Sequence, residues 1–218
     1  MRMTRIESQH DQPAEPARTR RLPEWWQPQV VPRAPEGYVE MIAQVRDFLD
    51  ALAAAVPDED SVAHVTATLR DLTGRLAEAE VDEFHQLSGR IENVPGRGQV
   101  VVPPAVIENV DDVRIECTVT FTRHFLGGNG AVHGGTLPLL FDDILGRFAQ
   151  SGGRPIARTA YLHVDYRSIT PVEKPLRLVG EIVSELGRKR LIRATLKDGD
   201  TLCAEAEGLF VELRPGQP

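Results

Sequence analysis

A histidine, two glycines and two aspartates lie close together in the stretch "HGGTLPLLFDD", residues 133–143. Apolar residues follow the glycines at helical spacing, which predicts that Gly134 and Gly135 directly precede a helix. The first N–H groups of a helix have no partner within it and carry the positive end of the helix dipole. Because glycine has no Cβ, an acyl carbonyl or a phosphate can approach these N–H groups closely.

The two aspartates add a second chemical group to this helix. A carboxylate two turns along, close to a carbonyl whose oxygen is held by N–H groups, can act as a nucleophile or as a general base on water. The apolar residues form one stripe, and Asp142 and Asp143 fall on opposite flanks of it, so the helical wheel does not choose between them. A purely structural interpretation stays open as well, in which "HGG" is a tight turn from a strand into a buried helix.

Several other functions are disfavoured by composition and motifs. Cys117 and Cys203 lie far apart with no further Cys or His at ligand spacing, so we expect neither a disulfide framework nor a metal site. The glycines match neither the dinucleotide-binding fingerprint nor the P-loop. The net charge is −7, and no basic stripe suited to nucleic acid is present. No apolar run is long enough to span a bilayer, and we expect a cytoplasmic protein.

The chain divides into three segments that differ in composition and in the spacing of their apolar residues. Residues 1–36 are rich in proline and lack periodicity, which predicts a flexible N-terminal arm from which Trp25 or Trp26 docks on the body or on a partner chain. Residues 37–93 carry two helical stripes separated by Pro57, the second capped by Asp58 or Asp60, and they predict a helical hairpin.

In residues 94–218 the apolar residues recur at every second position instead of at helical spacing. The stretch "VRIECTVTFT", residues 113–122, alternates strictly between apolar and polar side chains, as in a half-buried antiparallel strand. Further strands are expected at 98–110, 159–167, 176–185, 189–197 and 201–213, the last three forming a meander. One helix interrupts these strands, so the pattern predicts an α+β fold with an antiparallel sheet.

The combination of these features resembles a known family. "GAVHGG", an aspartate nine residues after the histidine, "TAYLHVDYRSITP" and the meander together resemble the hotdog-fold acyl-CoA thioesterases. The subgroup includes the phenylacetate-pathway thioesterase and the human superfamily members with a His-Gly-Gly motif and a helical aspartate. The likeness covers residues 97–213 and implies a hotdog domain, in which the sheet wraps around one long central helix, preceded here by the helical extension.

The resemblance also implies roles for individual residues around the central helix. It places His133 and Gly134 at the oxyanion position, with the Gly134 amide as the donor, and Asp142, not Asp143, at the catalytic carboxylate. Thr159 matches a hydroxyl residue that positions the attacking water. In relatives this hydroxyl faces the carboxylate of a second subunit, so we expect a homodimer or homotetramer with shared sites.

Substrate-binding residues follow from the same likeness. Asn129 is expected to take the polar role of the loop asparagine, and Gly135, which lacks a Cβ, is expected to let an acyl carbonyl or a phosphate approach the start of the helix. The turn residues Arg188, Lys189 and Arg190 are expected to meet the phosphates of coenzyme A.

The function expected from the resemblance is hydrolysis of an acyl-CoA or acyl-carrier thioester to a free acid and a thiol. Coenzyme A then enters only as part of the substrate, and no separate cofactor is expected. Two alternatives stay open: a non-catalytic acyl-CoA-binding hotdog module, and a hotdog dehydratase or hydratase. The position of Asp142 after His133 favours the thioesterase over the dehydratase.

Overall fold

The computed structural model of the protein describes residues 33–83, 85–91 and 94–214. It contains three α-helices: α1 (Tyr38–Ala54), α2 (Glu59–Ala77) and α3 (Thr136–Phe148). The main sheet comprises β1 (Val106–Val110), β2 (Arg114–Thr120), β5 (Ala157–Tyr166), β6 (Pro175–Leu186), β7 (Lys189–Asp198) and β8 (Thr201–Glu212). Two shorter strands, β3 (Leu126–Gly128) and β4 (Ala131–Val132), pair as a separate hairpin. None of the described helices is long and apolar enough to cross a bilayer.

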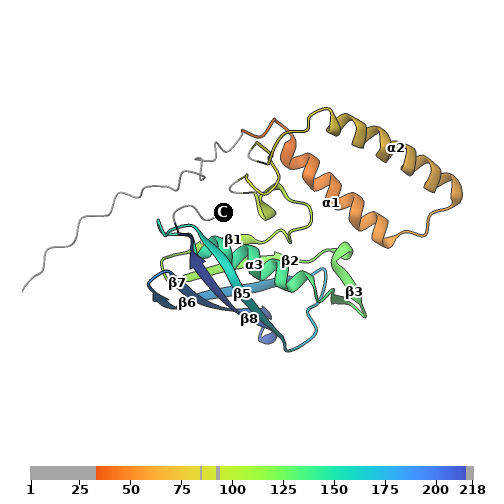
Figure 1. Ribbon diagram of the computed structural model, residues 1–218. Helices are drawn as coiled ribbons and strands as arrows, with labels where there is room; N and C mark the ends of the chain where they lie inside the picture. The colour runs from red at the N-terminus through yellow and green to blue at the C-terminus, as the bar shows by residue number, and fades with distance from the viewer. Residues whose placement is uncertain (1–32, 84, 92–93, 215–218) are drawn as a thin grey trace, which may run out of the picture.

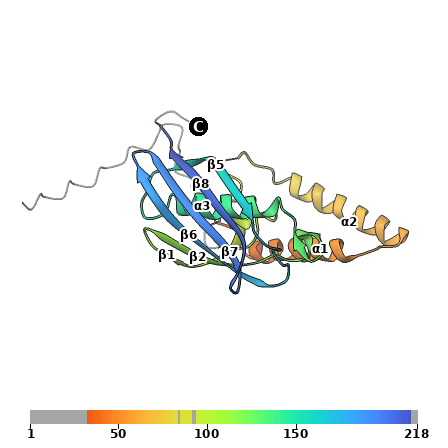
Figure 2. The same cartoon turned by 90° about the horizontal axis from the view of Figure 1, so that it is seen from below.

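The six-stranded sheet has the order β1-β2-β6-β7-β8-β5, with every neighbouring pair antiparallel. Helix α3 lies across one face of this sheet, and β5 and β1 are the two edge strands (Figures 1 and 2). This is the predicted hotdog arrangement.

The apolar stripe of α3 holds the helix on the sheet. Its members are less than about a tenth exposed and face the strands: Leu137, Leu140, Phe141, Ile144, Leu145 and Phe148. Gly180 of β6 allows the close approach, because a Cβ there would lie 2.9 Å from the Ile115 side chain and 3.1 Å from that of Leu145. Burying six large apolar side chains on one helix face contributes on the order of 10 kcal/mol before entropic costs are counted.

The first strand is shorter than the sequence predicts. It begins at Val106, not at residue 98, because Gly98 ends the tight turn Pro95–Gly98, and Pro103 and Pro104 have no backbone N–H to pair with a neighbouring strand. Gly96 and Arg97 within this turn both have positive φ angles, 68° and 51°. The β3–β4 hairpin was not predicted, since its strands are too short for a period of two to be visible.

The helical hairpin projects to one side of the sheet (Figure 1). Asp58 caps α2 by accepting a 2.8 Å hydrogen bond from the Ser61 amide, as expected for one of the two candidate caps. No residue of α2 is buried, so the apolar stripe of this helix is only partly covered by α1. Trp25 and Trp26 lie outside the described residues.

Two polar side chains fasten α1 to the sheet domain. The Arg46 guanidinium donates to the carbonyls of Gln99, at 2.6 Å, and Pro95, at 3.3 Å. Asp50 accepts from the backbone amide of His124 at 2.8 Å, and its carboxylate lies 2.7 Å from the His124 Nδ1. Burial raises the pKa of Asp50, but the hydrogen bonds with His124 outweigh burial and hold this pKa below its usual value.

The first prediction concerns this contact. Because the Asp50 pKa is lowered on folding, the ionised carboxylate stabilises the fold above the unfolded pKa of about 4, and the stabilisation is lost as the pH falls through the folded pKa. Asp50→Asn should therefore lower the free energy of unfolding by about 1–2 kcal/mol near neutral pH, and the difference from wild type should shrink toward about pH 3. Urea unfolding at both pH values measures it.

Asp47→Asn is the matched control, since Asp47 lies on the same helix and is exposed. A difference at Asp50 that is equal at both pH values, or that Asp47→Asn reproduces, would contradict the assigned contact.

Candidate functional site

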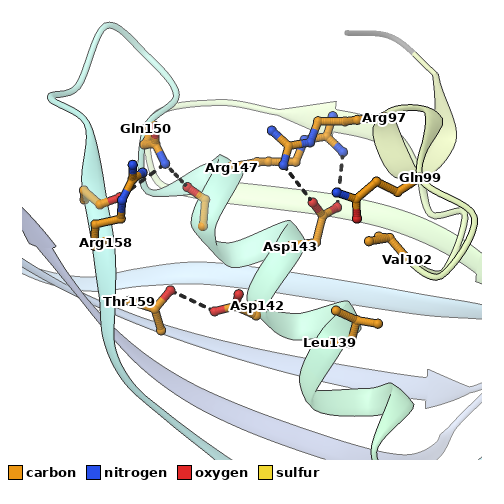
Figure 3. A pocket seen from close by; sticks show the side chains of 12 residues that line it. Arg97, Gln99, Val102, Leu139, Asp142, Asp143, Arg147, Gln150, Arg158 and Thr159 are labelled. Carbon is orange, nitrogen blue, oxygen red and sulfur yellow. Dashed lines mark hydrogen bonds and ion pairs between the residues drawn. The ribbon is translucent and has the colours of Figure 1, made fainter. Parts of the chain in front are cut away.

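Asp142 is held by a hydroxyl on the neighbouring edge strand. Thr159 of β5 donates a 2.8 Å hydrogen bond to the Asp142 Oδ1 on α3 (Figure 3). Both side chains are exposed in the chain by itself. The carboxylate is therefore oriented but open to a ligand, as a group that takes part in chemistry must be.

This contact corrects one expectation. Thr159 was expected to face Asp142 of a second subunit, but the structure places both residues within hydrogen-bonding distance in one chain. A β-bulge between Thr159 and Tyr161 is the physical reason. The extra residue turns Thr159 to the helix-facing side that Leu162 and Val164 also occupy.

Asp143 points to the opposite flank of α3. Its side chain is only 9% exposed and lies between two arginines, 3.6 Å from the Arg97 Nη2 and 3.7 Å from the Arg147 Nη1. Arg97 belongs to the Pro95–Gly98 turn that Arg46 of α1 holds in place. Asp143 is thus an ion-pair partner that joins α3 to the N-terminal part of the chain.

The "HGG" turn is fixed on both sides before α3 begins. The His133 amide donates to the Phe125 carbonyl at 2.7 Å, and the Gly135 amide donates to the His133 Nδ1 at 3.1 Å. Gly127 is required here, because a Cβ at that position would lie 2.7 Å from the His133 Cα. The Gly134 amide donates a hydrogen bond to none of the described residues, so this N–H is available to a ligand.

Tyr166 is a site residue that the sequence analysis missed. Its hydroxyl donates to the Gly134 carbonyl at 2.8 Å and thereby fixes the peptide next to the free amide. The signal was present in the alternation of β5, because Tyr166 follows Leu162 and Val164 on the helix-facing side. A tyrosine that anchors a turn is indistinguishable in sequence from one that packs.

A pocket of about 300 Å³ opens beside Asp142 and Thr159. It lies between α3, the start of β5 and the segment 97–102 (Figure 3). Its polar lining is rich in cations and amides, namely Arg97, Gln99, Arg147, Gln150 and Arg158, and the Asp143 carboxylate lies among them. Nothing in the sequence indicates that Arg97 and Arg158, 61 positions apart, line the same cavity.

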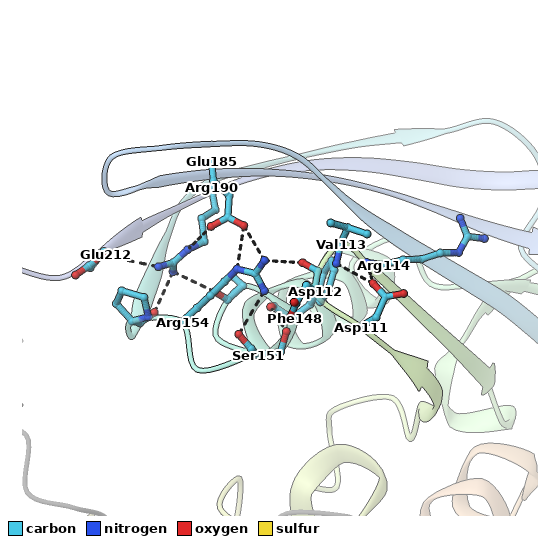
Figure 4. Close-up of polar contacts among 12 residues, drawn as sticks. Asp111, Asp112, Val113, Arg114, Phe148, Ser151, Arg154, Glu185, Arg190 and Glu212 are labelled. Atoms are coloured by element: carbon cyan, nitrogen blue, oxygen red, sulfur yellow. Dashed lines mark hydrogen bonds and ion pairs between the residues drawn. The ribbon is translucent and has the colours of Figure 1, made fainter. Parts of the chain in front are cut away.

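The structure corrects the expected role of Arg190. This side chain is 4% exposed, and its Nη1 donates to the carbonyls of Ala149, at 3.0 Å, and Pro155, at 2.9 Å (Figure 4). Its guanidinium also lies 3.6 Å from Glu185 and 3.7 Å from Glu212. Arg190 therefore ties the end of α3 to the sheet and is not available to phosphates of a ligand.

The other expected ligand-binding residues lie in separate places. Arg188 donates to the Glu212 carbonyl at 2.6 Å, whereas Lys189 is exposed at the start of β7. Asn129 sits in the turn between β3 and β4 with a φ of 52° and does not line the pocket beside Asp142. Gly135 stands at the start of α3, next to the Gly134 amide.

The two cysteines lie inside the protein and form no disulfide with each other. Cys117 and Cys203 are both buried and free, and burial raises the pKa of the Cys117 thiol to about 12. In the described ranges no three His, Cys, Asp or Glu side chains gather as they would around a metal ion.

Comparison with known proteins identifies the family. The family model of the thioesterase superfamily matches residues 129–204, which include Asp142 and Thr159. A thioesterase superfamily protein of known crystal structure is 30% identical, with a TM-score of 0.71, and the match covers 82% of this chain and 92% of that one. The chain belongs to the thioesterase superfamily. A match over 82% of the chain exceeds what the sheet domain supplies, so the similarity extends into the preceding segment.

Two curated relatives match a smaller part. The acyl-coenzyme A thioesterase THEM4 of Rattus norvegicus is 32% identical over 116 residues, which are 52% of this chain and 50% of that protein. THEM4 of Mus musculus is 33% identical over 97 residues, 44% of this chain and 41% of that protein. The chain thus spans about half the length or less of the curated relatives it matches.

The second prediction separates the two aspartates by stability. Asp143→Asn removes the carboxylate shared by Arg97 and Arg147 and should lower the free energy of unfolding by about 1–3 kcal/mol. Asp142→Asn, at an exposed position, should change it by less than about 0.5 kcal/mol. Chemical denaturation of both variants measures this, and equal losses would contradict the different roles described above.

Proposed function

We propose that this protein hydrolyses acyl-CoA thioesters to a free acid and coenzyme A. The observation that carries the proposal is that one helix presents an available amide at Gly134 and, two turns later, a carboxylate oriented by Thr159. Membership of the thioesterase superfamily and the names of the curated relatives support this assignment.

The proposed reaction uses these groups in a defined order. The thioester carbonyl oxygen accepts a hydrogen bond from the Gly134 amide, which stabilises the negative charge that develops on it. Asp142 removes a proton from water as the water oxygen attacks the carbonyl carbon. The carbon–sulfur bond then breaks, the acid leaves, and the coenzyme A thiolate takes up the proton. Asp142 as a direct nucleophile is the alternative path to the same products.

Thr159 supports the general-base path. Because its hydroxyl hydrogen is directed at Asp142, its oxygen lone pairs face outward and can accept a hydrogen bond from the attacking water. Tyr166 acts as a positioning residue, since it fixes the peptide that carries the Gly134 amide.

We propose Lys189 as a contact for the coenzyme A phosphates, because it keeps an exposed ammonium in the turn where the resemblance places them. Location in the cytoplasm and assembly into a homodimer or homotetramer stay predictions as well. The exposed edge strand β5 offers a surface for pairing, since it is the last strand of the sheet.

The third prediction tests the chemistry. Asp142→Asn should lower kcat by at least about a hundredfold, because the amide cannot accept the proton, whereas Asp143→Asn should lose far less while folded. Release of free thiol across a panel of acyl-CoAs with different chain lengths and aryl groups measures both. Comparable losses at the two positions would contradict the assigned roles, and binding without thiol release by wild type would indicate a non-catalytic module.

The fourth prediction tests whether the Asp142–Thr159 pair works within one chain. Mixed dimers can be made by co-expressing an Asp142→Ala chain with a Thr159→Ala chain. Because Asp142 and Thr159 of one chain form each site, every site in the mixed dimer carries one of the two substitutions, and activity should not recover. A mixture of Asp142→Ala with wild type should retain one intact site in each mixed dimer and serves as the control. Recovery toward half of the wild-type activity in the doubly mutant mixture would reject the intrachain pair.

A further inference from the structure

The pocket beside Asp142 is lined by more positive than negative charge. Three arginines border it, namely Arg97, Arg147 and Arg158, and the carboxylates in its lining are Asp142 and Asp143 (Figure 3). Asp143 is shared by Arg97 and Arg147, and Asp142 is the group that performs the proposed chemistry. The lining therefore holds an uncompensated positive charge close to the reacting carboxylate.

Two of these arginines have donors without a partner. Arg158, exposed at the start of β5, forms no ion pair with any residue that the structure describes. The Arg97 Nε is buried and has no hydrogen-bond partner among the described residues. This Nε is therefore available to donate to an acceptor on a bound ligand.

Two of these arginines also line a neighbouring hollow. A second hollow of about 510 Å³ lies beyond, with an apolar part formed by Ile107, Val110, Ile115 and Phe148. Arg97, Arg147 and Gln150 line both spaces. A hydrocarbon chain that ran from one space into the other would pass along these polar side chains.

The spacing along α3 sets the size of a fitting acyl group. Arg147 follows Asp142 by five residues, which is a rise of about 7.5 Å along the helix axis combined with a rotation of about 140° around it, so the acyl group would cross the exposed side of the helix. A methyl end at this distance would desolvate guanidinium groups without replacing their hydrogen bonds, which is unfavourable. A carboxylate would instead accept charge-assisted hydrogen bonds from them, in the geometry that arginine favours.

We propose that the arginines select short acyl groups that end in a carboxylate, so that the preferred substrates are thioesters of dicarboxylic acids. This inference rests on the proposed thioester hydrolysis and adds the substrate class. Asp142 acts at the thioester end of the substrate. The distal carboxylate is bound by Arg158 together with Arg97 and Arg147.

The test compares matched substrates that differ in the terminal group. We expect kcat/KM to be at least about tenfold higher for glutaryl-CoA than for valeryl-CoA, and for adipoyl-CoA than for hexanoyl-CoA. Arg158→Gln and Arg97→Gln should each reduce this ratio by about tenfold. Arg177→Gln, which removes an exposed arginine on β6 outside the pocket, should leave the ratio unchanged. Equal or higher activity on the methyl-ended substrates, or a ratio that the arginine variants do not alter, would overturn the proposal.

The phosphates of coenzyme A are the other anions that these arginines could bind. Thioesters of the same four acyl groups with N-acetylcysteamine, which lacks the nucleotide, distinguish binding of the acyl carboxylate from binding of the coenzyme A phosphates. Persistence of the carboxylate preference and of the arginine effect on these thioesters supports the proposal. If the carboxylate preference and the effect of the arginine variants both disappear when the nucleotide is absent, the arginines bind coenzyme A and the proposal is overturned.

A binding measurement separates this inference from the proposed function. Calorimetry with the Asp142→Asn protein should give tighter binding of glutaryl-CoA than of valeryl-CoA, whether or not the wild type hydrolyses either. Absence of thiol release from every substrate together with this preference would refute the hydrolysis and leave the carboxylate site standing. Equal binding of the two would overturn the carboxylate site even if hydrolysis is fast.

Discussion

The arrangement of the site depends on the one-sided packing of α3 against the sheet. Six large apolar side chains fix the rotation of this helix, and Gly180 fixes how closely it lies. Once the rotation is set, Asp142 must face the edge strand β5 and Asp143 must face the segment before β1. The two neighbouring carboxylates therefore enter different environments, one open and held by a hydroxyl, the other enclosed by two guanidinium groups. A different rotation would exchange their surroundings.

The N-terminal extension takes part in this arrangement through a short chain of contacts. Helix α1 holds the Pro95–Gly98 turn through Arg46, and the turn carries Arg97 to Asp143. The same helix contacts His124, next to Phe125, whose carbonyl holds the His133 amide. Both ends of the candidate site are thus connected to α1, although none of the described residues of the helical hairpin lines the pocket. The similarity to the solved superfamily structure likewise extends beyond the sheet domain.

The sequence predicted the elements well and the contacts between them less well. The period of 3.6 identified the helices, and the period of two identified the sheet strands, because both follow from which side chains must be buried. The helical wheel placed Asp142 and Asp143 on opposite flanks of α3. The resemblance to the family indicated that Asp142 is the catalytic carboxylate. The bulge in β5 that brings Thr159 to Asp142 in the same chain has no marker in the sequence, and the burial of Arg190 likewise depends on carbonyls that the fold brings to it. Arg97 could not be assigned to the site, because its position depends on a turn with two positive φ angles directly before the segment that was predicted as a strand.

The central claim is that a thioester lies between the Gly134 amide and the carboxylate of Asp142. The most direct measurement is a crystal structure of the Asp142→Asn protein with a bound acyl-CoA that it no longer hydrolyses. The account predicts that the thioester carbonyl oxygen accepts a hydrogen bond from the Gly134 amide, with the carbonyl carbon beside residue 142 and the Thr159 hydroxyl. A thioester bound elsewhere, or one whose carbonyl oxygen points away from the start of α3, would contradict the account.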